Sequence, residues 1–465
     1  MKLAINGGDK VRTKAFPNQA CIGDLEMDAV RRVMQTQMLS GYRGNAEKYR
    51  GGVEVQRFEE MWSQKFGSKH SIAINSCTSA LHVACMAIGL KPGDEVIVTP
   101  YSMTCSATAP LLCGATPVFA DVEPDFFCLD PESVRSKITE KTKAIIVVDL
   151  FGQPFNQRIM EIAKENNLYV IEDAAQAVGA SSVTRVDYKD SYKETHQYTG
   201  TFGYIGCFSF TQGKHMTAGE GGMITTDDDV LAMKCRLLMN HAEAVINDMF
   251  EAETPNKLQR QMLESTYSDL WGFNMRMTEI QAAILQEQLN RLDGFIQRRQ
   301  ANANYLATQL IDIPPIWEAP IRHGCTHSYY VQAFLWQQQE AEGIRRGTFI
   351  NAVKAELTGM DGRESEGVRI GNGYIKPLYR MPIFENQTKH LLLKQMESDH
   401  SKLWPNVERL WKDELFLHLY LAMPTAKVDL DDIVRAFHKV WDNRDELLET
   451  AETRLLRRNL QEEGL

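Results

Sequence analysis

The sequence lacks any apolar run long enough to cross a membrane, although 43% of its 465 residues are hydrophobic. A spanning helix needs about 20 consecutive apolar residues, and the N-terminus also lacks the apolar core of a secretion signal. The nine cysteines show no CxxC or Cys/His spacing typical of metal sites. We therefore expect a cytoplasmic protein with reduced cysteines, no metal and no membrane contact.

Basic stretches are also scarce, since the formal net charge is −10 and basic residues form only short clusters, such as the arginine pairs at 345–346 and 457–458. Nucleic-acid binding needs a local basic patch, so we expect no nucleic-acid partner. Internal repeats and low-complexity segments are absent as well. The length is sufficient for one large domain and a smaller one.

Apolar strand-like runs alternate with helical patterns in the first half of the chain. Strands are predicted in 71–75, 95–100, 116–122 and 143–149, and helical segments at about 102–113, 131–138 and 157–166. Such alternation indicates an α/β fold with a largely parallel sheet covered on both faces. Ligands then collect at the carboxyl ends of the strands.

Residues 205–222 hold a lysine between two apolar strands. The run IGCFSF leads into a polar turn containing Lys214, glycines at 219, 221 and 222 permit tight turns, and the run GGMITT (221–226) closes the unit. Removing an ammonium from water favours the neutral amine, which Schiff-base chemistry requires. A solvated lysine on a hairpin turn is the alternative interpretation.

A carboxylate stands at the end of another strand, because the apolar run Tyr169–Ile171 continues to Asp173. A strand-end carboxylate facing a strand-end lysine can be a plain ion pair. It can also be the pair that pyridoxal phosphate requires, with the acid at the pyridine nitrogen and the lysine at the aldehyde. Ser209, five residues before Lys214, could then bind a phosphate oxygen.

The run FSFTQGKHMTAGEGG (208–222), preceded by VIEDAAQAVGA (170–180), resembles the sugar aminotransferases of the DegT/DnrJ/StrS type. These are pyridoxal 5'-phosphate enzymes of fold type I, and the resemblance extends from the N-terminus to about residue 443. It implies Lys214 as the Schiff-base lysine and Asp173 as the partner of the ring nitrogen. The implied large domain is followed by a smaller C-terminal α/β domain.

The resemblance also implies further cofactor contacts. Thr78 and Ser79 open a helix whose N-terminus can bind phosphate, although simple N-capping is the alternative. Met103 stands where relatives place an aromatic ring over the cofactor, and it could equally fill the core. Gln176 matches a residue at or beside the cofactor, with a surface glutamine as the alternative. Asn274 matches an asparagine that reaches the neighbouring subunit's phosphate, which implies a homodimer with shared active sites.

Substrate contacts are predicted from two further places. Tyr42 and Arg43 lie in a glycine-punctuated loop and could touch substrate or stay at the surface. His327 matches a family histidine near the substrate, although a lone histidine is often structural. The stretches 181–203 and 243–271 look longer than in relatives, and they could form lids, specificity elements or inert insertions.

The predicted organisation has four parts: an N-terminal arm in 1–20, near the active site or across a dimer, a large cofactor-binding domain in 21–312, a small domain in 313–445 and a helical tail in 446–465. Pro314 and Pro315 mark the boundary between the two domains. Within the small domain, 327–336 is predicted as a strand. The segment after Trp271 is predicted to continue as one long helix.

The resemblance implies a ping-pong transamination through a Lys214 aldimine, with glutamate as amino donor and a nucleotide-linked keto sugar as acceptor. One alternative is a keto-cyclitol acceptor with glutamine as donor. Others are a sugar dehydratase, whose relatives carry histidine in place of the lysine, and a non-sugar pyridoxal enzyme such as a racemase or lyase. The last is a non-catalytic binding protein, against which Lys214 and Asp173 together argue.

Overall fold

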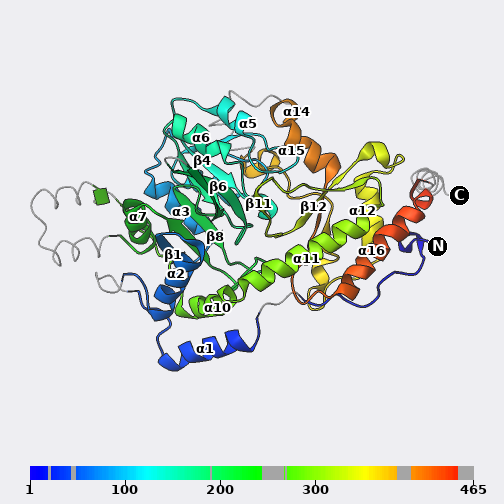
Figure 1. The fold of residues 1–465 in the computed structure, drawn as a ribbon, viewed down its shortest axis with the longest axis horizontal. Helices are drawn as coiled ribbons and strands as arrows, with labels where there is room; N and C mark the ends of the chain where they lie inside the picture. Colours follow the sequence, from blue (N-terminus) through cyan, green and yellow to red (C-terminus); the bar gives the residue numbers. More distant parts are fainter. Residues whose placement is uncertain are drawn as a thin grey trace, which may run out of the picture.

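A seven-stranded, mostly parallel sheet forms the centre of the large domain (Figure 1). The computed structural model describes residues 1–18, 22–42, 49–188, 191–242, 266–267, 270–384 and 400–448. The strand order is β1-β9-β8-β5-β4-β2-β3, and only β9 runs antiparallel to its neighbours. The strands are β1 His70–Ile74, β2 Glu95–Val98, β3 Thr116–Phe119, β4 Thr142–Val148, β5 Tyr169–Asp173, β8 Ile205–Ser209 and β9 Gly222–Thr226.

Helices cover both faces of this sheet, because its strands are apolar on both sides. Consecutive residues of β4 from Ala144 to Val148 are buried, with no polar alternation. The predicted α/β fold is therefore confirmed. The helices of this part are α1 Asp24–Thr36, α2 Val53–Phe66, α3 Cys77–Ala87, α4 Cys105–Leu112, α5 Pro131–Lys137, α6 Arg158–Glu165, α7 Asp229–Met239 and α10 Glu279–Leu289. Among the described residues, no helix is both long and apolar enough to span a bilayer.

A second, four-stranded sheet builds the small domain in the order β10-β12-β14-β13. Side chains of its central strands alternate between two cores, since neighbouring residues of a strand point to opposite faces. Leu335 and Leu417 join the core of the large domain, whereas Phe334 and Phe416 join the core beneath α12 and α16. The elements are β10 Ile316–Glu318, β12 Gln332–Trp336, β13 Ile370–Gly371, β14 Leu415–His418, α12 Arg346–Ala355 and α16 Lys427–Asp442, whereas α14 His400–Leu403 and α15 Pro405–Arg409 pack on the large-domain core through Trp404 and Val407.

Two helices replace the single long helix predicted after Trp271. The helix is interrupted at Asn290–Arg291. Helix α10 ends before these residues, and α11 follows them over Leu292–Leu310. The break lets α10 pack on α1 and α2, while α11 crosses from one core to the other. Leu292 belongs to the large-domain core, and Leu306 and Leu310 belong to the small-domain core.

Most of the stretch 181–203, for which the sequence predicted no strands, forms a hairpin. Strands β6 (Ser181–Tyr188) and β7 (Ser191–Tyr198) pair antiparallel, and β11 (Cys325–Thr326) adds a third strand. The predicted strand over 327–336 is also wrong in part, because Tyr329 has a positive φ and β12 begins only at Gln332. Most of the other long stretch, 243–271, lies outside the described residues.

The N-terminal arm packs on the small domain, and its expected place near the active site or across a dimer stays a prediction. Leu3 and Phe16 are fully buried in the small-domain core, and Phe16 pairs with Met360. Arg12 forms ion pairs with Asp429 and Asp432 at the start of α16. Burial of these apolar and paired side chains fixes the arm there.

Candidate active site

The ends of β5 and β8 bring Asp173 and Lys214 together. The two strands are parallel neighbours, with Asp173 opposite Cys207. Lys214 follows in the connection from β8 to β9, and its charge acts on the Asp173 carboxylate. The structure therefore places Asp173 at the end of β5 and Lys214 five residues beyond the end of β8, near enough for the lysine charge to act on the carboxylate, at the edge where α/β sheets bind ligands.

Asp173 is a buried carboxylate with few donors. Ser106 Oγ on α4 donates to one carboxylate oxygen at 2.7 Å, and the Cys77 thiol on α3 donates to the other at 3.8 Å. Burial raises the pKa of Asp173, while Ser106 and the Lys214 charge pull that pKa down. A cationic N–H placed against this carboxylate would offset the cost of burial, as a protonated ring nitrogen does.

A turn and an aromatic ring hold Lys214. Its backbone N–H donates to the Thr211 carbonyl at 3.2 Å. Gly219 closes the turn with φ +82°, a conformation favoured by glycine. The Lys214 Nζ lies 4.4 Å from the ring centroid of Tyr330. The backbone of Tyr330 is held in place, because its N–H donates to the Phe151 carbonyl and its carbonyl accepts from the Arg299 guanidinium. The lysine is thus half-buried and held between the domains, not a freely solvated residue of a hairpin turn.

The N-terminus of α3 lies against the same strands. Ser76 is the N-cap and accepts from the Ser79 N–H at 3.1 Å, and Ser76 Oγ donates to Ser79 Oγ at 3.0 Å. Gly222 pairs with Ser209, and a Cβ on Gly222 would lie 2.6–2.8 Å from the backbone of Ser76 and Cys77. This close approach places Ser209 beside the positive end of α3, where an anion is favoured. Thr78 is exposed there.

Gln176 is buried and links the two domains. Its side-chain oxygen accepts from the Phe151 N–H at 3.0 Å, and its amide donates to the Tyr374 hydroxyl at 3.0 Å. The alternative of a surface glutamine is therefore wrong. Tyr374 stands edge-on to Tyr101 and Phe151, and its pKa is raised mainly by burial and in part by Asp173, so the small domain contributes a wall beside Asp173.

Met103 and Asn274 are exposed in the single chain. Met103 is 51% exposed just before α4, so the core-filling alternative is wrong and its thioether remains available to a ligand. Asn274 accepts from Arg276 Nε at 2.7 Å, and the Met275 carbonyl accepts from the Asn75 N–H. The Asn274 segment thus runs beside the loop that enters α3.

The predicted substrate residues lie in different surroundings. Tyr42 is 8% exposed, so it is not a surface residue, and its hydroxyl finds no partner among the described residues. Arg43 lies outside the described residues. His327 Nδ1 accepts from the Tyr329 N–H at 3.0 Å, and burial lowers the pKa of His327 to about 3. The residue is therefore a neutral imidazole with a structural hydrogen bond.

Comparison with known proteins decides which enzymes share this arrangement. A model of the DegT/DnrJ/EryC1/StrS aminotransferase family matches residues 22–437. The chain belongs to this family. It is 32% identical to an L-glutamine:2-deoxy-scyllo-inosose aminotransferase of Streptomyces kanamyceticus, over 95% of this chain and 97% of that one. It is 41% identical to a GDP-perosamine synthase of Caulobacter vibrioides over 54% of this chain and 60% of that one.

A solved aminotransferase from Psychrobacter cryohalolentis has the same fold, with a TM-score of 0.74 and 29% identity over 92% of this chain and 99% of that one. The protein is therefore an aminotransferase, and pyridoxal phosphate is its expected cofactor. The site fits that group. A buried carboxylate, a lysine and the N-terminus of α3 meet one another, with the chemistry needed at the ring nitrogen, the aldehyde and the phosphate.

Sequence analysis missed four side chains of the site. Ser106 contacts Asp173 directly, Ser76 caps α3, and Tyr330 and Tyr374 approach from the small domain. Ser76 could have been found from the strand–turn–helix pattern, since serine is a favoured N-cap. The other three contacts join residues far apart in the chain, so no local pattern marks them.

Proposed function

We propose that this aminotransferase moves an amino group from glutamate to a keto sugar carried on a nucleotide, with pyridoxal phosphate as cofactor. The observation that carries the proposal is that Asp173 ends β5, beside the neighbouring strand β8, and that Lys214, in the turn after β8, lies near enough for its charge to act on the buried carboxylate. The similarity to a GDP-perosamine synthase supports a nucleotide-linked acceptor.

Each end of the cofactor would have its own protein groups. Asp173 would hold the ring nitrogen, Lys214 the aldehyde end, and Thr78, Ser79 and Ser209 the phosphate, with Met103 over one face of the ring. When bound, pyridoxal phosphate supplies an electron sink for the carbanion formed at the amino-bearing carbon. Ser106 and Cys77 keep the Asp173 carboxylate in place for the ring.

Lys214 would move the proton between the substrate carbon and the cofactor, as a general base and then a general acid. Its half-buried position, with Nζ 4.4 Å from the Tyr330 ring centroid, holds the amine near one place. The small domain covers this side through Tyr330 and Tyr374, which limits the access of water to the reacting carbon.

A keto-cyclitol acceptor with glutamine as donor is the second candidate. The share of this chain that each relative matches favours it. The similarity to the cyclitol aminotransferase covers 95% of this chain, whereas the similarity to the perosamine synthase covers 54%. The two candidates share the first half of the reaction and differ in donor and acceptor.

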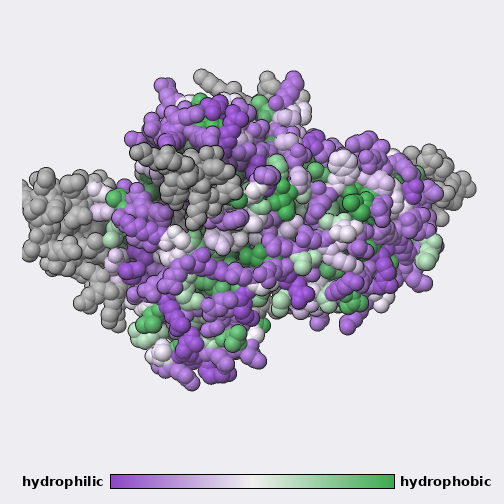
Figure 2. All heavy atoms as spheres, viewed as in Figure 1, coloured by the Kyte–Doolittle hydropathy of each residue, from purple (hydrophilic) through white to green (hydrophobic). Residues whose placement is uncertain are grey.

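A homodimer would complete the site, with Asn274 of each chain reaching toward the other chain's phosphate. Exposed apolar side chains support an interface here, since Trp271 is 83% exposed and Phe273 is 40% exposed beside Asn274. Helix α1 also presents Leu25, Met27 and Met34, each about half exposed, and Figure 2 shows hydrophobic residues among hydrophilic ones on this part of the surface.

The two half-reactions test the function separately. Protein loaded with pyridoxal phosphate is mixed with glutamate or glutamine, and the loss of the visible cofactor band and the formation of pyridoxamine phosphate are measured. The aminated protein is then offered nucleotide-linked keto sugars and keto-cyclitols. Lys214→Ala should abolish both half-reactions without unfolding the protein. Turnover that persists in Lys214→Ala would contradict the assignment, and return of the band only with a cyclitol would select the second candidate.

A further inference from the structure

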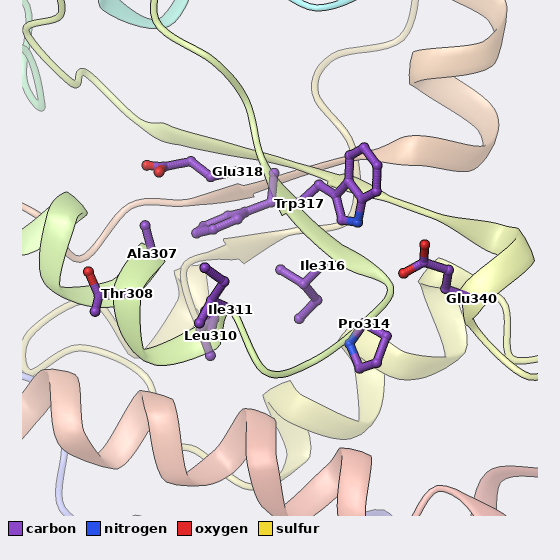
Figure 3. Close-up of a pocket in the computed structure, with 10 residues that line it drawn as sticks. Ala307, Thr308, Leu310, Ile311, Pro314, Ile316, Trp317, Glu318 and Glu340 are labelled. Atoms are coloured by element: carbon purple, nitrogen blue, oxygen red, sulfur yellow. The ribbon is translucent and has the colours of Figure 1, made fainter.

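A groove that shares no lining residue with the pocket at Lys214 crosses the small domain (Figure 3). Its volume is about 690 Å³, and it lies between the end of α11, the turn that follows and β10. The figure shows an apolar floor with one acidic side chain on each side of it, Glu318 and Glu340. The lining residues are Ala307, Thr308, Leu310, Ile311, Pro314, Ile316, Trp317, Glu318, Phe334 and Glu340.

Large apolar side chains are unusually exposed in this groove. Ile311 is 74% exposed and Trp317 is 53% exposed, next to the buried floor residues Leu310 and Phe334. Scattered exposed apolar residues are ordinary, but a contiguous hollow of them is typical of a surface that another segment covers.

The two acids of the groove lack cations. Glu318 accepts from Gln332 Nε2 at 2.9 Å, and burial raises the pKa of Glu318. Within the part of the chain that the structure describes, neither Glu318 nor Glu340 forms an ion pair. A basic group entering the groove would therefore gain two carboxylates that have no competing cation.

The described chain ends close to this groove. Leu447 is buried in the small-domain core, and Leu448 lies 3.8 Å from the position of a Cβ on Gly343. Arg444 also pairs with Glu342 at 2.8 Å. Gly343 follows Glu340 by three residues, so the last described residue is anchored beside one end of the groove.

Seventeen residues follow Leu448, and the part of them that complements the groove is the central run 454–460, which lies between glutamates at 449 and 452 and at 462 and 463. This run carries Arg454, Arg457 and Arg458 among Leu455, Leu456 and Leu460. As a helix, 17 residues span about 25 Å, and an extended chain reaches about 55 Å, so either form can cross the groove. Leucines four residues apart with flanking arginines are the anchors that an apolar groove with acidic sides accepts.

We propose that the C-terminal segment 449–465 docks in the groove of Ile311, Trp317, Glu318 and Glu340, with its leucines on the apolar floor and its arginines at the two carboxylates. The groove is built on the far end of α11, whose Arg299 binds the carbonyls of Tyr329 and Tyr330 next to Lys214. The docked segment would brace the helix that joins this surface to the active site.

The test uses a chain truncated after Leu448 and a fluorescent peptide with the sequence of 449–465. We expect the peptide to bind the truncated protein with a Kd of about 1–100 μM, and to bind the intact chain at least about tenfold more weakly because its own segment competes at high effective concentration. In the truncated protein, Glu318→Lys with Glu340→Lys should weaken binding by about tenfold or more.

Glu60→Lys, at an exposed position on α2 in the large domain, is the matched control and should leave the affinity unchanged. A peptide with its three arginines changed to glutamate should not bind the truncated protein, but it should bind the Glu318→Lys, Glu340→Lys variant. Binding to the variant also shows that the variant is folded. No binding to the truncated protein, equal binding to intact and truncated chains, or insensitivity to the groove substitutions would overturn the proposal. So would concentration-dependent self-association of the truncated protein that the groove substitutions abolish, because a second copy would then be the occupant.

Discussion

Ser106 decides how well Asp173 can hold a cationic ring. It is fully buried, and its hydroxyl lies 2.7 Å from the carboxylate in a site where Asp173 is 3% exposed. A hydrogen bond to a charged group contributes about 1.5–3 kcal/mol, so this single contact carries much of the support that the carboxylate receives from the protein.

Ser106→Ala should slow both half-reactions by about tenfold, because the Asp173 carboxylate loses its shortest donor. Stopped-flow measurement of the cofactor band with glutamate gives the rate. Ser136→Ala, on the exposed side of α5, should change nothing. A wild-type rate in Ser106→Ala would mean that the buried carboxylate does not need this hydroxyl.

Gly222 keeps β9 close to α3. A methyl group there would come within 2.6–2.8 Å of the Ser76 and Cys77 backbone, so Gly222→Ala should destabilise the protein by about 1–3 kcal/mol and weaken its affinity for pyridoxal phosphate. Urea denaturation and cofactor titration measure the two effects. Gly294→Ala is the matched control, because nothing lies within 4 Å of its added Cβ on α11, and alanine should stabilise that helix by about 0.5–1 kcal/mol.

Helices α2 and α7 are joined through one buried ion pair. Arg236 of α7 places its two terminal nitrogens 3.2 and 2.8 Å from the oxygens of Glu59 on α2, and it also donates to the Ser71 carbonyl of β1. Glu59 accepts from the Ala73 N–H of the same strand. The pair thus connects two helices with the edge of the sheet.

Arg236→Met should lower the free energy of unfolding by about 3–5 kcal/mol, because Glu59 would remain buried without its cation. The double variant Arg236→Met, Glu59→Gln should recover part of that loss, and urea denaturation of all three proteins measures it. Arg31→Met removes an exposed pair with Asp28 on α1 and should cost less than about 1 kcal/mol. Equal costs for the buried and the exposed pair would contradict the argument.

Buried neutral histidines make the stability of the whole molecule depend on pH. Burial lowers the pKa of His418 and of His327 to about 3, and it also lowers the pKa of His215. An unfolded histidine has a pKa of about 6.5. Between these values the unfolded chain binds more protons than the folded one, so stability is lost as pH falls from about 6.5 toward 3.

His418→Leu should make the free energy of unfolding depend less steeply on pH. His418 packs near Tyr420, its nitrogens have no partner within the described residues, and Arg369 is the neighbouring charge. The wild-type protein should lose up to about 1.4 kcal/mol per pH unit for this residue between pH 6 and 4, and the variant should lose correspondingly less. Guanidinium denaturation at several pH values compares them, and parallel curves for the two proteins would contradict the prediction.

The sequence alone determined the strand that ends at Asp173, the turn that carries Lys214, the helix whose first turn holds Thr78 and Ser79, and the aminotransferase family. Each depends on residues close together in the chain, where apolar runs, glycines and polar turns act through local geometry. The alternation of strands and helices likewise determined the α/β fold.

Only the tertiary structure decided which groups surround those residues. Ser106 reaches Asp173 across 67 positions and Tyr374 reaches Gln176 across 198, and local patterns contain no information on such pairs. The hairpin β6–β7, the break between α10 and α11, and the packing of the N-terminal arm were missed for the same reason. In each case the free energy comes from burial and pairing with distant segments, which outweigh local propensity.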